Sequence, residues 1–151
     1  MSEQTHLRDR LIELGEGEAS VLSLVQIAED DFVLRFESGI DVEVENLTAT
    51  GHAALSSMIG TPPETERLRV YEAMLIYGML WRDNGGVHMA LTEPRGALVQ
   101  LAEIPACDLA QHELTAVIKN FAEKALIWRA FLVPEATGDP APRFLEQELR
   151  A

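Results

Sequence analysis

Two stretches of alternating apolar and polar residues, FVLRFE from Phe32 and IDVEVENL from Ile40, most constrain the fold of this chain. Alternation with a period of two is typical of strands that have one buried and one solvated face. Residues 37–39, which run from the last residue of the first stretch to the glycine before the second, fit a three-residue hairpin loop with that glycine in the left-handed conformation. The sequence therefore predicts an antiparallel pair of strands.

The loop length decides which residues of this pair are buried. A three-residue loop sets Phe36 opposite Ile40 and Leu34 opposite Val42, so that the large apolar residues share one face. A two-residue loop would set Leu34 opposite Glu43 and bury a carboxylate beside apolar side chains, which is costly. We therefore expect the longer loop. The acidic residues on the solvated face are then Asp41, Glu43 and Glu45.

The preceding stretch VLSLVQIA is predicted to add a third strand, but it is apolar on both faces. A two-residue turn at the following Asp-Asp pair would leave Leu22 and Leu24 outward beside Val33. A three-residue turn would instead leave Val25 and Ile27 outward. Both registers place large aliphatic side chains away from the main core, so we expect another surface to cover them.

The remaining elements follow from helical spacing, caps and turn residues. Thr61 begins a capping-box pattern with Glu64, and the segment Asn84-Gly-Gly terminates the helix that follows. Residues 48–60 are expected to be a connecting segment. The other predicted elements are a helix over residues 5–14, a helix from Thr61 to about Arg82, a hairpin over residues 87–104 and a helix from a cap at Asp108 to about Leu132.

The predicted hairpin has the sequence VHMALTEPRGALVQLAEIP. If residues 94–96 form a turn that ends on a left-handed glycine, Leu91 pairs with Val99 and Met89 with Leu101 on one apolar face. The polar residues expected on the opposite face are His88, Thr92 and Gln100. The helix before this hairpin is apolar around most of its circumference, which indicates more than one partner surface.

Length and charge set the class of protein. The chain has 151 residues, 47% of them hydrophobic, which suits one domain with a real core. We expect that domain over residues 1–133 and a flexible tail over 134–151, with at most a short helix at 144–149. The net charge of −13 argues against binding nucleic acid through phosphates. We expect a cytoplasmic protein because no segment resembles a signal peptide or a membrane span.

No pattern in the sequence indicates catalysis, a metal site or a cofactor. The four histidines are not arranged in a metal-binding spacing, and no phosphate-binding or dinucleotide-binding motif occurs. Cys107 is the only cysteine and lacks a catalytic signature, so an inert thiol is the expected interpretation. We therefore expect no enzyme activity and no small-molecule substrate. What the sequence does show is surplus apolar surface, which favours binding to another polypeptide.

The order helix, three strands, helix, two strands, helix resembles the type III secretion chaperones of the single-effector, CesT-like family. The resemblance covers about residues 5–132. It rests on the hairpin that follows Gly86, the turn at Gly96, the strand end at Ile104-Pro105 and the apolar stripe of the last helix. It implies an α+β fold with an antiparallel sheet, and a homodimer without ATPase activity. The implied function is to hold the N-terminal segment of an effector protein in the cytoplasm of a Gram-negative bacterium.

The resemblance also implies two groups of site residues. In the family, the second helix and the strand after it build the dimer interface, and apolar patches on the first helix and first sheet bind the effector. The matching interface candidates are Leu68, Tyr71, Leu75, Met79, His88 and Met89. The matching effector-binding candidates are Leu7, Leu11, Leu22, Leu24 and Val33. A non-secretory adaptor on the same architecture is the alternative, since a fold does not fix a function.

Overall fold

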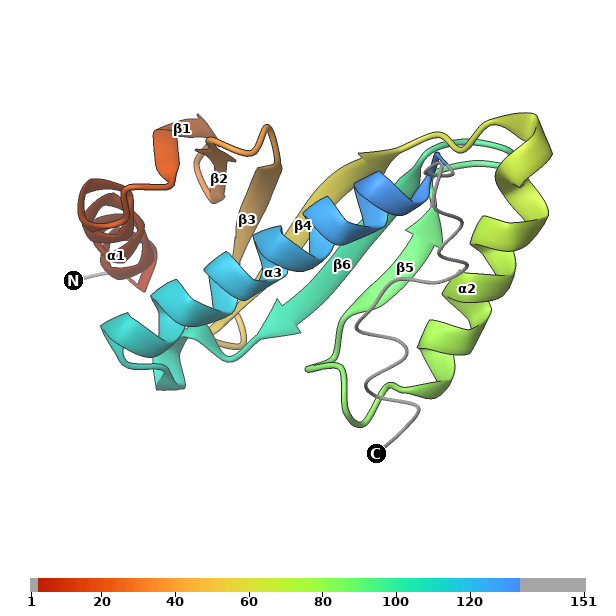
Figure 1. The fold of residues 1–151 in the computed structure, drawn as a ribbon. Coiled ribbons are helices and arrows are strands. Elements are labelled where there is room, and N and C mark those ends of the chain that lie inside the picture. The colour runs from red at the N-terminus through yellow and green to blue at the C-terminus, as the bar shows by residue number, and fades with distance from the viewer. Residues whose placement is uncertain (1–2, 134–151) are drawn as a thin grey trace.

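A computed structural model describes residues 3–133 of the chain as a twisted antiparallel sheet with helices on one side (Figure 1). The elements are α1 (Glu3–Gly17), β1 (Val21–Ala28), β2 (Asp31–Phe36), β3 (Asp41–Leu47), β4 (His52–Gly60), α2 (Arg67–Met79), β5 (His88–Leu91), β6 (Leu98–Ile104) and α3 (Gln111–Phe131). Single 3-10 turns, Glu64–Glu66 and Ala106–Asp108, precede α2 and α3. The predicted α+β class is confirmed, and the expected tail lies outside the described residues.

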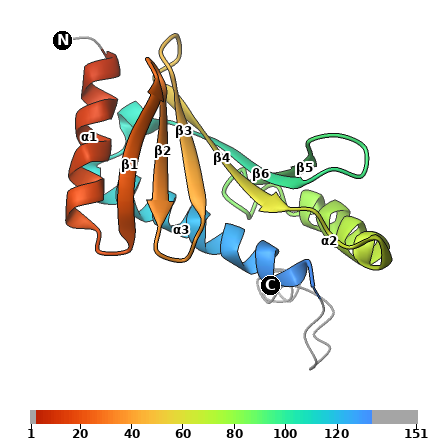
Figure 2. The ribbon, with the colours of Figure 1, turned by 90° about the horizontal axis from the view of Figure 1, so that it is seen from above.

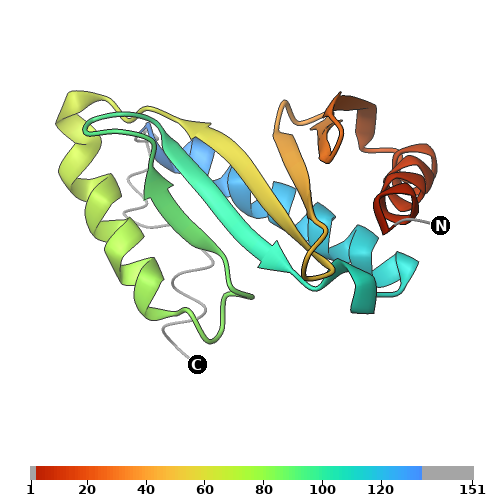
Figure 3. The same ribbon diagram turned by 180° about the vertical axis from the view of Figure 1, so that it is seen from behind.

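The six strands are arranged in the order β1-β2-β3-β4-β6-β5. Helix α3 runs along the inner face of the sheet, with α1 beside β1 and α2 beside β5 at the two ends (Figures 1 and 2). Seen from behind, the strands β4, β6 and β5 lie in front of α3 and no described helix covers them (Figure 3). The core therefore forms between the inner face of the sheet and the helices.

The register predicted for β2 and β3 is confirmed. Leu34 is opposite Val42, and the backbone N–H of Phe36 donates to the carbonyl of Ile40 at 2.9 Å. Gly39 takes a φ of 88°, as the left-handed position of a three-residue loop requires. The apolar residues of the pair are buried because this register alone puts them all on the inner face.

The segment 48–60 is not a connection, as we had expected, because it contains a central strand. Residues 48–51 form a turn that ends at Gly51, with φ 72°, and β4 then pairs with both β3 and β6. The buried side of β4 consists of Ala53, Leu55, Ser57 and Ile59. Two of these four side chains are small or polar, so the alternation is too weak to stand out in the sequence.

The predicted register of the β5–β6 hairpin is wrong by one residue. Leu91 pairs with Leu98, and the loop has four residues between the hydrogen-bonded partners Thr92 and Ala97. The left-handed residue in this loop is Arg95, with φ 61°, and not the glycine that follows it. Because one slip reverses every side chain of a strand, β6 turns Gln100 into the core where we had expected it to face solvent.

The ends of the helices also differ from the sequence-based boundaries. Helix α2 begins at Arg67 and ends at Met79; of the predicted capping-box residues, Thr61 lies before the 3-10 turn and Glu64 is the first residue of that turn. Helix α3 begins at Gln111, and the side chain of Glu113 accepts a hydrogen bond from the backbone N–H of Ala110 at 3.1 Å. Only the glutamate half of a capping box is present, because the N-cap alanine has no side-chain acceptor, and it lies two residues later than the predicted box.

Arginine side chains fasten the helices to the rest of the fold. Arg10 of α1 donates to the backbone carbonyls of Ala106 and Leu109, which precede α3. Arg69 of α2 donates to the carbonyl of Phe131 and lies 4.1 Å above the centre of its ring. These contacts tie both outer helices to the ends of α3.

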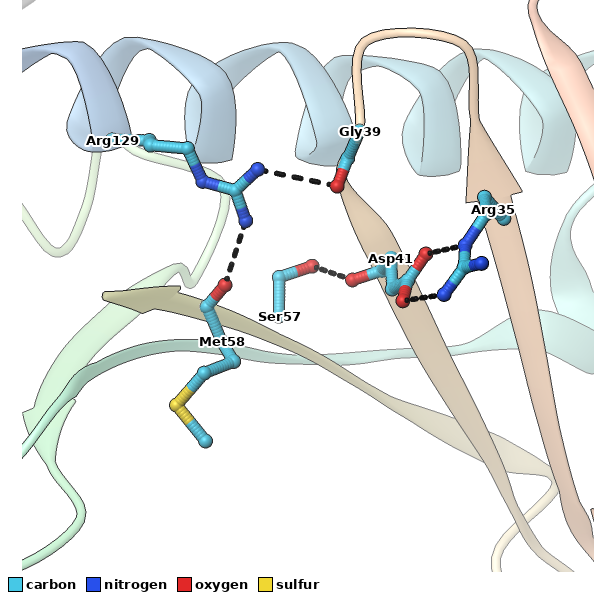
Figure 4. A network of polar contacts seen from close by, with 6 residues as sticks. All are labelled: Arg35, Gly39, Asp41, Ser57, Met58 and Arg129. Carbon is cyan, nitrogen blue, oxygen red and sulfur yellow. Dashed lines mark hydrogen bonds and ion pairs between the residues drawn. The ribbon is translucent and has the colours of Figure 1, made fainter.

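A third arginine closes a split in the sheet. Strands β3 and β4 cease to pair beyond Ser56, and at this point Arg129 of α3 donates to the carbonyls of Gly39 and Met58 (Figure 4). It also donates to the carbonyl of Ile59. The hydroxyl of Ser57 also donates to the carbonyl of Asp41 at 2.8 Å. The carbonyl groups at the split are thereby satisfied, although no neighbouring strand reaches them.

Candidate binding surfaces

Helix α2 has two apolar sides, of which one is buried in the fold and one is open. Val70, Ala73 and Tyr77 face the core. The side chains of Leu68, Leu75 and Met79, which we call the α2 stripe, are between 67% and 79% exposed. The spacing of the stripe, seven and then four residues, keeps it on one face of the helix. A helix apolar on two sides is what the sequence indicated, and the open side has no cover among residues 3–133.

The other three predicted interface residues lie near the α2 stripe but are less open. Tyr71 of α2 is half-buried and packs against the core. On β5, His88 is exposed beside Leu101 on the outer face of the sheet, whereas Met89 is half-buried opposite Gln100. The α2 stripe and His88 are thus the exposed part of the predicted interface, whereas Tyr71 and Met89 already pack against the core.

A second open apolar surface lies on the outer face of β1 and β2. Strand β1 turns into β2 through Glu29 and Asp30, and its pairing is irregular next to Leu22 and Ile27. The residues exposed as a result are Leu22, Val25 and Ile27, which are between 52% and 65% exposed, beside the half-buried Val33. We call these four residues the β1 patch. Figure 2 looks onto this face, and no described helix lies over it.

The irregularities in β1 decide a question that the sequence left open. Leu24 lies opposite Leu34 on the inner face and packs against the core, whereas Val25 lies opposite Val33 on the outer face. The outward set is therefore close to the one expected from a three-residue turn, and Leu22, which lies at the first irregularity, is exposed as well. Leu24, one of the predicted effector-binding residues, is not part of the open surface.

Leu7 and Leu11 of α1, two further predicted effector-binding residues, are also corrected by the structure. Both are buried in the core together with Leu14. The helical stripe of α1 faces β1 and α3, so these side chains are not part of the open surface. The part of α1 that is open to a partner is the side that borders β1. An open cleft of about 300 Å³ lies between Ile12, Gly15 and Glu16 of α1 and residues 21–24 of β1.

Acidic side chains border the β1 patch. Glu43 and Glu45 of β3 are exposed on the same outer face, directly opposite Val33 and Asp31 of β2. No ion pair to either glutamate occurs among the described residues, and we call this pair the acidic row.

The next carboxylate along β3 differs from the acidic row. Two hydrogen bonds of 2.9 Å from Arg35 reach Asp41 and lower the pKa of its carboxyl group below the usual range. Arg35 is thus already paired. Glu43 and Glu45 are exposed and have no ion pair among the described residues, and Asp31, opposite Glu45, adds a third carboxylate without an ion pair there.

The described residues contain no arrangement that suggests a reaction. No group of three His, Cys, Asp or Glu side chains within residues 3–133 is placed to hold a metal ion. His52 is paired with Glu103 at 2.8 Å. Cys107 is exposed beside Gly51. The helices between residues 3 and 133 are all too short or too polar to cross a membrane.

Comparison with known proteins decides the family. The model of the Tir chaperone protein (CesT) family matches residues 17–129, which is most of the chain. The chain belongs to the Tir chaperone protein (CesT) family. The matched range runs from the end of α1 to the last turn of α3, so it contains the whole sheet, the α2 stripe and the β1 patch. The family resemblance inferred from the residues is thereby confirmed.

Solved structures show the same fold at low sequence identity. The structure of the ExsC–ExsE complex contains a chain of TM-score 0.70 and 18% identity, with 87% of this chain and 97% of that chain covered. The HopA1–SchA chaperone–effector complex gives a TM-score of 0.63 and 15% identity, with 84% and 95% covered. No curated protein sequence matches the chain.

The fold also occurs outside complexes of this kind. An uncharacterized protein from Methanothermobacter thermautotrophicus has a TM-score of 0.53 and 16% identity, with 83% of this chain and 94% of that chain covered. The CesT-family assignment therefore rests on the family match, whereas the structural likeness establishes the architecture.

Proposed function

We propose that this CesT-family chain is a type III secretion chaperone, which binds the N-terminal region of a cognate effector in the cytoplasm and keeps it soluble and competent for secretion. The observation that carries the proposal is the β1 patch. Three large aliphatic side chains stand more than half exposed on an uncovered face of the sheet. Exposed apolar surface of this kind marks an interaction site on a soluble protein.

The topology of the sheet suits a client that is not folded. β1 is an edge strand, so its outer edge presents backbone groups to which an extended segment can add as a further strand. The cleft beside α1 offers a place for side chains of such a segment. Binding of this type needs no nucleotide, because the energy comes from burial of apolar area and from backbone hydrogen bonds.

We further propose that the chain is a homodimer and that the α2 stripe is its interface. The stripe and the β1 patch lie at opposite ends of the sheet, so that a partner subunit on α2 would leave β1 open in both subunits (Figure 1). Two residues of β5, the half-buried Met89 and the exposed His88, lie at the same end of the molecule as the α2 stripe. Two copies then present two client surfaces, and a client that wraps both can bury enough area to offset its ordering.

Affinity purification of the full chain from its own bacterium, followed by mass spectrometry, tests the proposed function. We expect one or a few co-purified proteins whose N-terminal region is protected from protease while bound, with the rest of each protein unprotected or independently folded. A partner that binds through a folded domain, and that is not exported, would contradict the secretion role and support a non-secretory adaptor.

A further inference from the structure

The outer face of β1 to β3 joins an apolar strip to an acidic one. In register across three strands lie Val25, Val33 and Glu43. Neighbouring strands are about 4.8 Å apart, so Val33 of β2 is next to the acidic row on β3, and the apolar side chains of β1 lie one strand farther, about 10 Å from it. We propose that this face binds an amphipathic helix of the client that carries Lys or Arg along the flank facing β3. The proposal rests on the function proposed above and specifies the client of that same patch.

The backbone of the client decides between a helix and a strand on this face. A strand that lies flat on the face has no neighbour for its N–H and C=O groups, which are costly to leave unpaired. A helix satisfies these groups internally and buries one apolar stripe. The sheet already has helices on its inner face, and a client helix on the outer face would complete a three-layer arrangement. An added strand remains the suitable occupant of the β1 edge.

The dimensions of the patch agree with one short helix. From Leu22 to Ile27 the strand extends over about 16 Å, at about 3.3 Å per residue. A helix of three turns has about the same length. The diameter of a helix with its side chains, about 10 Å, covers two strands and brings one flank over the third. The helix would therefore rest on β1 and β2, with its flank above Glu43 and Glu45.

The charges on the face determine which side chains are favourable on the flank of that helix. Glu43 and Glu45 are exposed and have no partner among the described residues, whereas the nearby cation Arg35 is held by Asp41. Lys or Arg side chains of a client would meet two unopposed carboxylates, and a helix with Glu or Asp on that flank would be repelled. A second copy of this chain is a poor occupant of this face, because a chain of net charge −13 would bring further negative charge next to Glu43 and Glu45. The acidic row thus adds specificity to an otherwise nonselective apolar patch.

The test uses the full chain and synthetic helical peptides of fifteen residues labelled with fluorescein. Two peptides have the same leucine stripe and carry either lysines or glutamates along one flank. Fluorescence anisotropy should show roughly tenfold tighter binding of the lysine peptide, which corresponds to two or three exposed charge pairs. The difference should shrink at high salt, since exposed charges are screened. Equal binding of the two peptides would overturn the proposal.

Variants of the acidic row provide the second arm. Glu43→Lys with Glu45→Lys should reverse the preference, and Glu43→Gln with Glu45→Gln should remove it while disturbing the fold less. Asp83→Lys with Glu123→Lys makes the same change in net charge at exposed sites elsewhere and should keep the preference. If this control loses the preference equally, the effect comes from net charge and the acidic row has no specific role.

The conformation of the occupant is tested separately. A lysine peptide with a central proline cannot keep the helix, and we expect it to bind at least tenfold more weakly. If it binds as well as its helical parent, the occupant is extended and the inference is wrong. These results are independent of affinity purification. If an effector is captured but the peptides bind equally, the chaperone function is supported and the basic client helix is rejected. If the captured partner is a non-exported adaptor but the lysine peptide is clearly preferred, the basic helix is supported and the secretion function is rejected.

Discussion

The Nε2 atom of Gln100 donates a hydrogen bond of 2.9 Å to the carbonyl oxygen of Phe121, and so joins β6 to the middle of α3. Gln100 is fully buried, and its Oε1 atom has no hydrogen-bond partner among the described residues. This contact sets the position of α3 over the sheet by a polar interaction within an apolar core. It also requires the register of β6 that the sequence failed to predict.

Replacement of this side chain should separate the polar contact from simple filling of space. Gln100→Leu removes one hydrogen bond and one unpaired oxygen, so we expect the free energy of unfolding to change by less than about 1 kcal/mol. Gln100→Ala leaves a cavity and should lower it by about 2 kcal/mol or more. Urea unfolding of the two variants measures both. A large loss for Gln100→Leu would show that the hydrogen bond contributes more than an apolar contact does.

The β5–β6 loop should become more stable when its left-handed residue is changed. Arg95 has φ 61° after Pro94, as at the third position of a type II turn, where glycine is preferred. We expect Arg95→Gly to raise the free energy of unfolding by up to about 1 kcal/mol. Gly96→Ala is the contrasting variant, because an added Cβ would lie 2.5 Å from the Cγ of Glu93. Gly96→Ala should destabilise the fold. Thermal unfolding of the Arg95→Gly and Gly96→Ala variants measures both effects.

The Arg35–Asp41 pair should make a small contribution to stability that depends on pH. The hydrogen bond from Arg35 and its positive charge lower the pKa of Asp41 in the folded chain. The pair therefore stabilises the fold above the ordinary aspartate pKa of about 3.9, and this contribution is lost as the pH falls through the lower folded value. Asp41→Asn should reduce stability at pH 7 and have less effect near pH 2.5. The side chains of Arg35 and Asp41 are 61% and 41% exposed, so solvent screens the pair and the effect is modest.

Chemical unfolding at the two pH values measures this difference. Asp83→Asn is a matched control, because Asp83 is an exposed aspartate without an ion pair among the described residues. An equal effect of Asp41→Asn at both pH values would mean that the carboxylate charge is not what stabilises the turn between β2 and β3.

The α2 stripe should control self-association and contribute little to the fold of one subunit. Leu75 is the most exposed of its large apolar residues, so Leu75→Asp should convert a dimer to a monomer while circular dichroism and the unfolding midpoint stay close to those of the parent. Leu126→Asp, on the exposed side of α3, should leave the dimer intact. Multi-angle light scattering distinguishes these outcomes. A parent chain that is monomeric at micromolar concentration would refute the proposed interface.

The β1 patch should control client capture without affecting the dimer. Val25→Asp with Ile27→Asp places two charges on the outer face, where they cost the fold little but oppose burial of a client. We expect loss of the co-purified client and an unchanged dimer. Leu24→Asp is the informative contrast, since Leu24 packs against the core and its replacement should unfold the sheet. Retention of the client by the double variant would place the binding surface elsewhere.

Part of this fold could be predicted from local sequence because each prediction depended on one strong pattern. The β2–β3 register followed from a strict alternation that has only one arrangement without a buried carboxylate. The strand β4 was missed because Ala53 and Ser57 occupy buried positions with side chains that do not signal burial. The predicted register of the β5–β6 hairpin was wrong because Arg95, and not the neighbouring glycine, adopts the left-handed conformation.

The candidate binding surfaces, like the fold, could be predicted from the sequence only in part. That α2 and β1 have more apolar surface than one core needs was visible in the sequence, because helical and strand periods report which sides of an element are apolar. Which of those sides is open was not visible. Leu7, Leu11 and Leu24 were expected on the surface and are packed against the core, since burial depends on which other elements lie against each side.

The sequence by itself determined the fold class, the β2–β3 register, the surplus of apolar surface and the strongly acidic character, because these depend on composition and on contacts between neighbours in the chain. The tertiary structure alone decided that β4 joins the two halves of the sheet and that all described helices lie on one face. It also decided that Val25 and Ile27, in place of Leu24, lie on the same outer face of the sheet as the acidic row. These outcomes depend on strand irregularities and on packing between distant segments, whose energies no local pattern contains.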